Sequence, residues 1–286
     1  MFAIAGVTGN TGSVVAETLL AQGKKVRVIV RDAAKGESWR AKGAEVVIAD
    51  LSDRAALTRA LTDVAGAYLL LPPDGTTKTP LELNAARTDV LVAAIKDARV
   101  PHVVFLSSIG AQHADGTGPI RGLHHAEQEL AKTGAALTFV RAAYFQENWG
   151  AALGMLPQGV LPTFVPAGFA YAQVSTKDIG RTAAAALVEG GAGTQIIELA
   201  GPRDLTAHDV AAAAARLSGK PVAASEAPTS AVVPTFTSFG LSAEVSDLYR
   251  EMYEGIASGK VAWEGRTARF VRGSVTIDET LAKLTA

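Results

Sequence analysis

The chain opens on a short apolar run that leads through a glycine-rich turn into a helical pattern. Phe2 to Ala5 reads as a strand, and apolar residues then recur at helical spacing from Val14 to Leu20. Further along, short apolar runs alternate with longer helical stretches. The predicted later strands are Lys25–Val30, Glu45–Ala49, Ala67–Leu71, His102–Leu106, Leu137–Val140 and, as the last one, Gln195–Leu199. Strands that are apolar on both faces and separated by helices predict an α/β fold with a doubly wound parallel sheet.

The residues at the ends of these strands predict where a ligand binds. In a doubly wound parallel sheet, ligands lie in the crevice outside the carboxyl ends of the strands. The segments expected to face this crevice are Gly6–Gly12, Arg31, Asp50, Leu71–Pro73, Ser107–Ser108 and Arg141–Phe145.

The pattern changes near Ala151, where glycine and proline become frequent through Phe169. We therefore expect a nucleotide-binding domain formed by residues 1–150 with about 172–200. Residues from about 151 to 171, together with 201–286, are expected to form a smaller C-terminal lobe over the crevice. The aromatic residues of this lobe are interpreted mainly as core, with some lining a substrate pocket.

The first turn has the spacing of a dinucleotide-binding site. Gly6 would allow the tight turn after the strand, Gly9 would let the backbone approach a pyrophosphate, and Gly12 would let helix and strand pack closely. The free N–H groups at the start of the helix would then face the phosphates. We assign the whole turn to cofactor binding: Gly6, Thr8, Gly9, Asn10, Thr11 and Gly12.

Composition removes several other classes of function. The 27 basic and 28 acidic residues leave a net charge of −1, and no charge run suggests binding to nucleic acid or to an anionic membrane. The absence of cysteine excludes disulfides and thiolate catalysis. The first predicted strand begins at residue 2, so no signal peptide is expected. No apolar run is long enough to span a bilayer. The expectation is a cytoplasmic protein that acts on a small molecule.

Several segments together resemble a known family. The chain is similar to the NmrA-like group of atypical short-chain dehydrogenases, which includes NAD(P)H-dependent quinone reductases and azoreductases. The segments that carry the resemblance are Gly6–Gly12, Val30–Asp32, Asp50–Leu51, Ser107–Gly110, Arg141–Phe145 with Glu147–Asn148, Val174–Ile179 and Leu199–Pro202. The resemblance implies a Rossmann-type fold and an NAD(P) cofactor. The further residues expected to contact the cofactor are Asp50, Leu51, Leu71, Pro72, Ser107, Ser108, Tyr144 and Phe145.

The end of the second strand bears on which nucleotide is bound. A site that prefers NAD usually places a carboxylate there, whereas Arg31 could clamp the 2′-phosphate of NADP, and Lys35 could add charge. Asp32 offers the opposite interpretation, because it could bond the ribose and select NAD. It is also well placed to cap the helix predicted over Ala33–Lys42. We expect NADP to be preferred, with NAD possible.

The residues that usually supply the proton are missing. Ordinary short-chain dehydrogenases carry Tyr-x-x-x-Lys on the helix after the fifth strand. If Glu127 matches the glutamate that follows this pair, Pro119 and Leu123 take the two positions. This argues against alcohol oxidation, which needs a base. Reduction of a quinone-like acceptor tolerates the loss better, because the charge is delocalised after hydride transfer and water can supply the proton.

Other side chains could act near the acceptor. His124 or Tyr144 could donate a proton. Tyr144 and Phe145 could equally form an aromatic wall or pack between lobes. Ser107 or Ser108 could bond the carboxamide or the substrate oxygen, or only backbone groups at the strand end. His113, Asp115, His124 and His125 could suggest a metal site, but adjacent histidines on one helix point different ways, so no metal is expected.

Three functions remain open. The first is an enzyme that transfers hydride directly from NADPH to a quinone-like or other conjugated acceptor. The second is a non-catalytic redox sensor that binds NAD(P) and signals through a homodimer or a protein partner. The third is a carbonyl reductase with His124 or Tyr144 as the acid.

Overall fold

The computed structural model describes residues 1–265 and 268–285. These residues form an eight-stranded parallel sheet in the order β12-β10-β6-β5-β4-β1-β2-β3. Its strands are β1 (Phe2–Ile4), β2 (Val26–Val30), β3 (Glu45–Ile48), β4 (Gly66–Leu69), β5 (His102–Ser108), β6 (Ala136–Ala142), β10 (Thr194–Ala200) and β12 (Arg269–Arg272). The predicted Rossmann-type α/β fold is confirmed.

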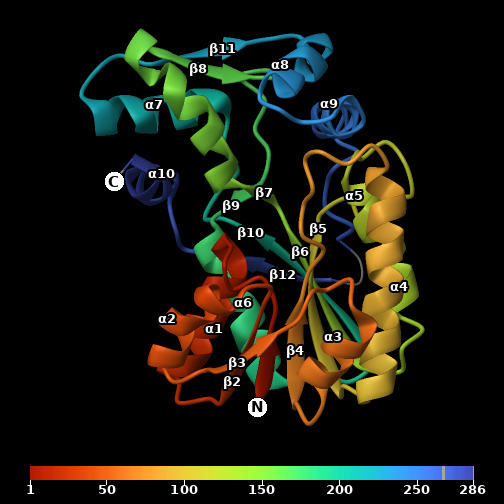
Figure 1. Ribbon diagram of the computed structural model, residues 1–286. Coiled ribbons are helices and arrows are strands. Elements are labelled where there is room, and N and C mark those ends of the chain that lie inside the picture. Colours follow the sequence, from red (N-terminus) through yellow and green to blue (C-terminus); the bar gives the residue numbers. More distant parts are fainter. Residues whose placement is uncertain (266–267, 286) are drawn as a thin grey trace.

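Helices cover both faces of the sheet (Figure 1). One face carries α1 (Asn10–Ala21), α2 (Glu37–Ala41) and α6 (Thr176–Glu189), and the other carries α3 (Arg54–Leu61), α4 (Pro80–Ala98) and α5 (Ile120–Leu130). Helices α1 and α6 pack very closely, since a Cβ on Gly180 would lie 2.5 Å from the Cβ of Val14. Such contact suits the small side chains of this alanine-rich chain.

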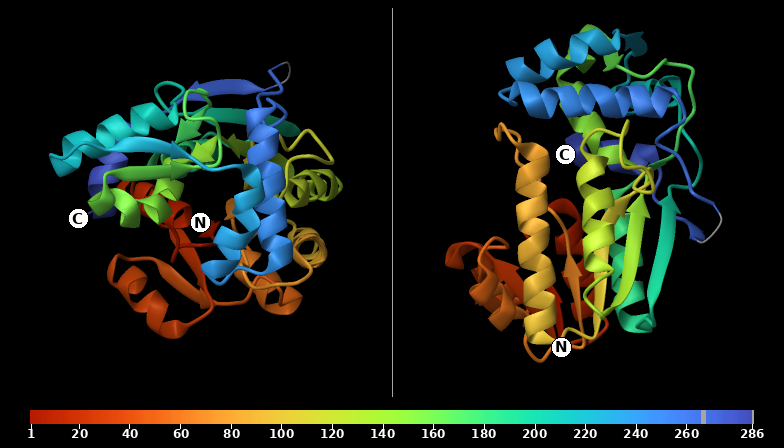
Figure 2. Two further views of the ribbon diagram at one scale, coloured as in Figure 1. Left: turned by 90° about the horizontal axis from the view of Figure 1, so that it is seen from above. Right: turned by 90° about the vertical axis from the view of Figure 1, so that its right-hand side faces the viewer.

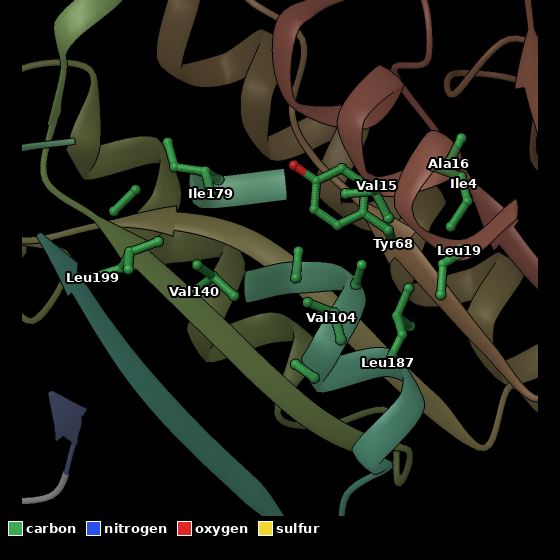
Figure 3. Close-up of a cluster of buried hydrophobic side chains, with 14 of the residues drawn as sticks. Ile4, Val15, Ala16, Leu19, Tyr68, Val104, Val140, Ile179, Leu187 and Leu199 are labelled. Carbon is green, nitrogen blue, oxygen red and sulfur yellow. The ribbon is translucent and has the colours of Figure 1, made fainter. Parts of the chain in front are cut away.

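Two hydrophobic cores follow from alternation along the strands. Ile4, Tyr68 and Val104 point toward α1 and α6, where they are buried with Val15 and Leu187 (Figure 3). Their immediate neighbours Ala3, Leu69 and Phe105 point to the opposite face and pack against α3, α4 and α5. Successive side chains of a strand face opposite sides of the sheet, so both faces must be apolar.

Two local expectations about secondary structure need correction. Gln195–Leu199 lies within β10 but is not the last strand, because β12 pairs in parallel with β10 at the edge of the sheet. Three of the four β12 residues are exposed, so the strand lacks the apolar pattern of the buried ones. The helix predicted over Ala33–Lys42 is also divided, into the 3₁₀ helix η1 (Ala33–Gly36) and α2. Gly36 packs against β3, where a Cβ would lie 2.4 Å from a methyl of Val46.

The remaining elements gather beyond the carboxyl ends of the sheet strands (Figures 1 and 2). They include η2 (Gln146–Gln158), β8 (Val160–Thr163), α7 (Ala207–Ser218), β11 (Ala223–Glu226), η3 (Thr229–Ala231), α8 (Val232–Ser238), α9 (Ala243–Ala257) and α10 (Ile277–Thr285). Strands β8 and β11 pair in parallel, as do β7 (Tyr144–Phe145) and β9 (Gln173–Val174). This second group of elements has its own buried cluster, which includes Trp149, Leu161 and Val210.

The expected division of the chain differs from the structure in one respect. β12 falls within residues 201–286, which were assigned to the smaller lobe, yet it belongs to the large sheet. Whether the two parts are separate domains stays a prediction. In the part of the chain that the structure describes, no helix combines the length and apolar character needed to cross a membrane.

Candidate active site

The glycine turn between β1 and α1 has the geometry expected of a phosphate cradle. Gly6 has a φ of +69°, which glycine adopts without strain. A Cβ on Gly12 would lie 2.4 Å from the carbonyl oxygen of Ala5, so only glycine lets α1 approach β1 this closely. Gly9 is exposed, and a Cβ there would come no closer than 3.4 Å to any other atom.

The start of α1 is open to an anion. Gly9 occupies the N-cap position, no side chain caps the helix, and its first turn contains no acidic residue. The first N–H groups of a helix have no partner within the helix, and the helix dipole favours a negative charge there. Thr8 and Asn10 are exposed at this end. Thr11 differs, because its buried hydroxyl bonds to the Tyr68 hydroxyl at 2.9 Å, which leaves its backbone as the group available to a ligand.

The next two strand ends carry an exposed cation and an engaged carboxylate. Arg31 and Lys35 are exposed at the end of β2 and in η1. The Asp32 side chain accepts a hydrogen bond from Ala34 N at 2.9 Å, so it caps η1 as expected. After β3, Asp50 accepts bonds from the Ser52 hydroxyl and N–H at 2.5 and 2.8 Å. These bonds, with a smaller contribution from Arg31, lower the pKa of Asp50 and keep it ionised.

The chain after β3 and β4 lines the same edge of the sheet. Leu51 and Leu71 are half-buried and pack against the core on the α3–α5 side. The carbonyl of Pro72 accepts a hydrogen bond from Arg87 at 2.8 Å, which fixes the loop that follows β4.

A small, mostly apolar cavity of about 40 Å³ lies at the carboxyl ends of β5 and β6. Ser108 and Tyr144 come from strand ends, whereas Met252 and Ile256 come from α9. The complete lining is Ser108, Ile109, Ile120, Tyr144, Tyr171, Ala172, Met252, Ile256 and Val261. The cavity therefore lies between the sheet and the second group of elements.

Tyrosines dominate the polar character of this region. The Tyr144 and Tyr253 hydroxyls lie 3.4 Å apart, and the Tyr144 and Tyr171 rings meet edge-on at 5.6 Å. Burial raises the pKa of Tyr144, and also that of Tyr253, so both hydroxyls remain protonated at neutral pH. The sequence assigned Tyr144 to the site, included Tyr253 only among the lobe aromatics expected to be mainly core, and did not point to Tyr171. The apolar spacing of Tyr249, Met252, Tyr253 and Ile256 on one helix face was the available signal.

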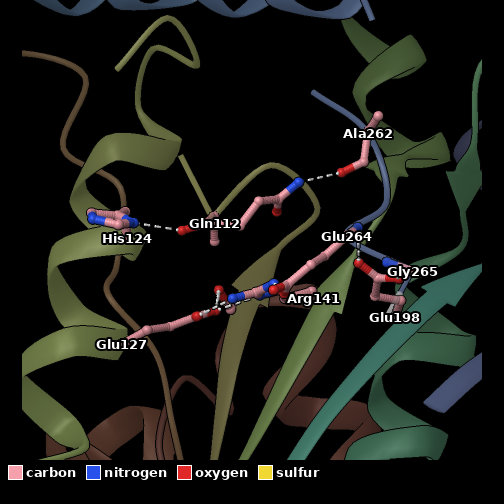
Figure 4. A network of polar contacts seen from close by, with 10 residues as sticks. Gln112, His124, Glu127, Arg141, Glu198, Ala262, Glu264 and Gly265 are labelled. Carbon is pink, nitrogen blue, oxygen red and sulfur yellow. Dashed lines mark hydrogen bonds and ion pairs between the residues drawn. The ribbon is translucent and has the colours of Figure 1, made fainter. Parts of the chain in front are cut away.

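The other candidate residues are engaged in structural contacts. The Nδ1 atom of His124 lies 2.8 Å from the Ala111 carbonyl, and His124 does not line the cavity (Figure 4). Phe145 is half-buried against the core beside α1 and α6. The Ser108 hydroxyl bonds to the Ile109 carbonyl at 3.0 Å. Asp115 pairs with Lys260. Across residues 1–265 and 268–285, no three His, Asp or Glu side chains are grouped as a metal site requires.

A buried ionic network lies beside the cavity (Figure 4). Arg141 on β6 donates from Nε and Nη2 to the two carboxylate oxygens of Glu127 on α5, at 3.0 and 2.6 Å. Both side chains are only 5% exposed. Ser107 donates its hydroxyl to the same carboxylate at 2.5 Å, so its side chain already has a partner. The sequence named Arg141 and Glu127 separately and did not predict that they pair.

Helix α5 contains no tyrosine and no lysine, and the two residues expected in the Tyr and Lys positions, if Glu127 matches the glutamate after the pair, are Pro119 and Leu123. Pro119 precedes α5, and Leu123 packs its side chain into hydrophobic clusters on either side of that helix. A comparison with known proteins places the whole arrangement, from the glycine turn to the residues that follow α9, in one family. The match to the NmrA-like family covers residues 1–265.

The chain belongs to the NmrA-like family. It is 29% identical over 259 residues to an NAD(P)H azoreductase of Xenophilus azovorans, which covers 88% of this chain and 86% of that protein. It is also 29% identical to quinone oxidoreductase 2 of Escherichia coli, over 99% of this chain and 98% of the relative. The crystal structure of an NADPH-dependent quinone oxidoreductase of Escherichia coli, complexed with NADPH, matches with a TM-score of 0.84 at 27% identity. That match covers 100% of both chains.

Proposed function

We propose that this protein is an NADPH-dependent reductase that transfers hydride directly to a quinone-like or other conjugated small-molecule acceptor, without a Tyr–Lys pair. The observation that carries the proposal is the open N-terminus of α1 at the same sheet edge as an apolar, tyrosine-lined cavity. Bound NADPH would supply the hydride, and the acceptor would take it together with a proton.

The residues around the turn suit the nucleotide. The N–H groups of residues 10–12 would bind the pyrophosphate, and Gly9 leaves room for its close approach. Arg31 would clamp the 2′-phosphate, with Lys35 adding positive charge. Because Asp32 is engaged in capping η1, its carboxylate is less available to select NAD.

The cavity walls suit a flat, conjugated acceptor. Apolar side chains exclude water and hold the acceptor in one orientation, which is the main catalytic contribution we assign to the protein. The paired hydroxyls of Tyr144 and Tyr253 can donate a hydrogen bond to an acceptor oxygen. Since the charge of a reduced quinone or azo compound is delocalised, water can complete the protonation.

The relatives support the same chemistry. Both the azoreductase and the quinone oxidoreductase are named for reduction of conjugated acceptors, and they align with 88% and 99% of this chain. The crystallised quinone oxidoreductase with NADPH has the same fold over its whole length.

The first experiment follows the loss of NADPH absorbance with a panel of quinones, azo dyes and ketones. Turnover on quinones or azo dyes is expected. Tight NADPH binding without turnover on any acceptor would instead favour the redox sensor. Turnover on ketones that falls in Tyr144→Phe or His124→Ala would favour the carbonyl reductase.

The nucleotide preference is tested separately with Arg31→Ala. Loss of a charge-assisted phosphate contact should weaken NADPH binding by about 10- to 100-fold while leaving NADH binding nearly unchanged. Arg40→Ala is the matched control, because Arg40 is an exposed arginine on α2 that pairs with Glu37. Equal loss of affinity for both nucleotides would contradict the role of Arg31.

A further inference from the structure

Residues 260–265 form a strap that leads from α9 toward β12 past the carboxyl ends of β6 and β10 (Figure 4). Glu264 reaches Arg141 through its side chain, and its backbone N–H donates to Glu198 at 2.6 Å. Gly265 N also donates to Glu198, at 3.3 Å. The Ala262 carbonyl accepts a bond from Gln112 at 2.9 Å. The strap is therefore fixed both to the sheet and to the loop after β5.

The contact with Glu264 completes the hydrogen bonding of the buried Arg141 guanidinium to carboxylates. Arg141 uses Nε and Nη2 for Glu127, which leaves Nη1 to donate to Glu264. Arg141 is 5% exposed, whereas Glu264 is 33% exposed. A rigid guanidinium presents its donors in fixed directions, so the position of Glu264 is set by a buried group that is itself held by α5. The strap is thus positioned by β6 and α5, far away in the sequence.

The strap also forms one wall of the cavity. Val261 lines it together with Ser108 and Tyr144. A Cβ on Gly110 would lie 3.3 Å from the Cα of Val261, so the strap lies tightly against the loop after β5. The space beside Val261 is small, about 40 Å³, and holds only a few water molecules, so the position of the strap bears on how large an acceptor can enter.

We propose that Glu264 is a positioning residue that, through Arg141, holds the strap against the cavity and so limits the size of acceptor that is reduced. This inference rests on the proposed function and adds to it a determinant of acceptor size. Releasing Glu264 would let Val261 move outward. The kcat/KM for large acceptors would then rise, and small acceptors would lose contact with the wall.

The test is Glu264→Gln, which removes the charge and so weakens the bond from Arg141 that holds the strap, while the Glu127–Arg141 pair stays intact. Steady-state kinetics with benzoquinone, a single ring, and phenanthrenequinone, three fused rings, give the ratio of kcat/KM for the large acceptor to that for the small one. We expect this ratio to rise about fivefold, mainly through KM. NADPH affinity and Tm should stay close to those of the wild-type protein.

Two further variants make the result specific. Val261→Ala shortens the side chain that lines the cavity and should also raise the ratio. Asp278→Asn breaks the Arg216–Asp278 pair, whose side chains are 61% and 47% exposed and lie away from the cavity, and should leave the ratio unchanged.

Each outcome bears on a distinct claim. A wild-type protein that reduces no acceptor would overturn the proposed function and this inference with it. Wild-type turnover with an unchanged ratio in Glu264→Gln would overturn the inference alone, whether or not Val261→Ala changes the ratio. A rise in Glu264→Gln that Asp278→Asn reproduces would also overturn it, because the effect would then be a general consequence of losing an ion pair.

Discussion

Replacing Arg141 with methionine tests whether the buried Glu127–Arg141 pair holds α5 to the sheet. The substitution keeps much of the side-chain volume but leaves Glu127, only 5% exposed, without its cation. Two unit charges about 4 Å apart attract by about 4 kcal/mol at an effective dielectric constant of about 20. Breaking one partner of a buried pair typically costs about 3–5 kcal/mol. We therefore expect Arg141→Met to lower the free energy of unfolding by about 3–5 kcal/mol.

The assay is equilibrium unfolding in urea for four proteins: wild type, Arg141→Met, Glu127→Gln and the double variant. Because the neutral glutamine no longer needs a cation, the double variant should be more stable than the sum of the two single losses implies. Asp97→Asn is the control, since it breaks the exposed Arg54–Asp97 pair and should cost at most about 1 kcal/mol. A loss below about 1 kcal/mol in Arg141→Met, or strictly additive losses in the double variant, would refute the reasoning.

Two further predictions concern the glycine turn and a buried histidine. Gly12→Ala should lower stability by about 1–3 kcal/mol, because its Cβ would lie 2.4 Å from the Ala5 carbonyl oxygen; thermal unfolding measures this. Gly9→Ala, at a φ of −108°, should leave stability nearly unchanged but weaken NADPH binding, and equal stability losses in both variants would contradict the two roles. Burial lowers the pKa of His102, so folding disfavours its protonation. The contribution of neutral His102 to the free energy of unfolding should therefore be fully present above about pH 6.5. It should fall as the pH drops from there toward the lower folded-state pKa. His102→Gln should reduce that slope, and an unchanged slope in urea unfolding at several pH values would show that His102 does not cause it.

The glycine turn was readable in the sequence because its conformation and its packing are local. Gly6 and Gly12 serve a backbone conformation and a close contact between adjacent elements, and both requirements appear within a few residues of chain. The same holds for Asp32, which caps the helix that directly follows it. Strand ends were also predictable, since a parallel sheet brings all its carboxyl ends to one edge.

The cavity could be predicted only in part. Tyr144 follows directly after a strand, so its position at the sheet edge could be inferred. Met252, Tyr253 and Ile256 reach the same region from α9. Their spacing marks one apolar face of that helix but does not show where the face docks. Residue types alone left Ser107 and Ser108 equivalent, and the structure separates them. Ser107 donates to buried Glu127, while Ser108 lines the cavity.

The sequence by itself determined the alternating α/β pattern, the glycine turn before α1, the cation at the end of β2 and the lack of a tyrosine and lysine on α5. These properties depend on neighbouring residues and on the periodicity of the regular elements. Only the tertiary structure decided that β12 returns to the sheet, that Glu264 joins Arg141 and Glu127, and that Val261 of the strap lines the cavity. Glu127 and Glu264 are separated by more than a hundred residues, and such contacts depend on how whole elements pack, which no local pattern encodes.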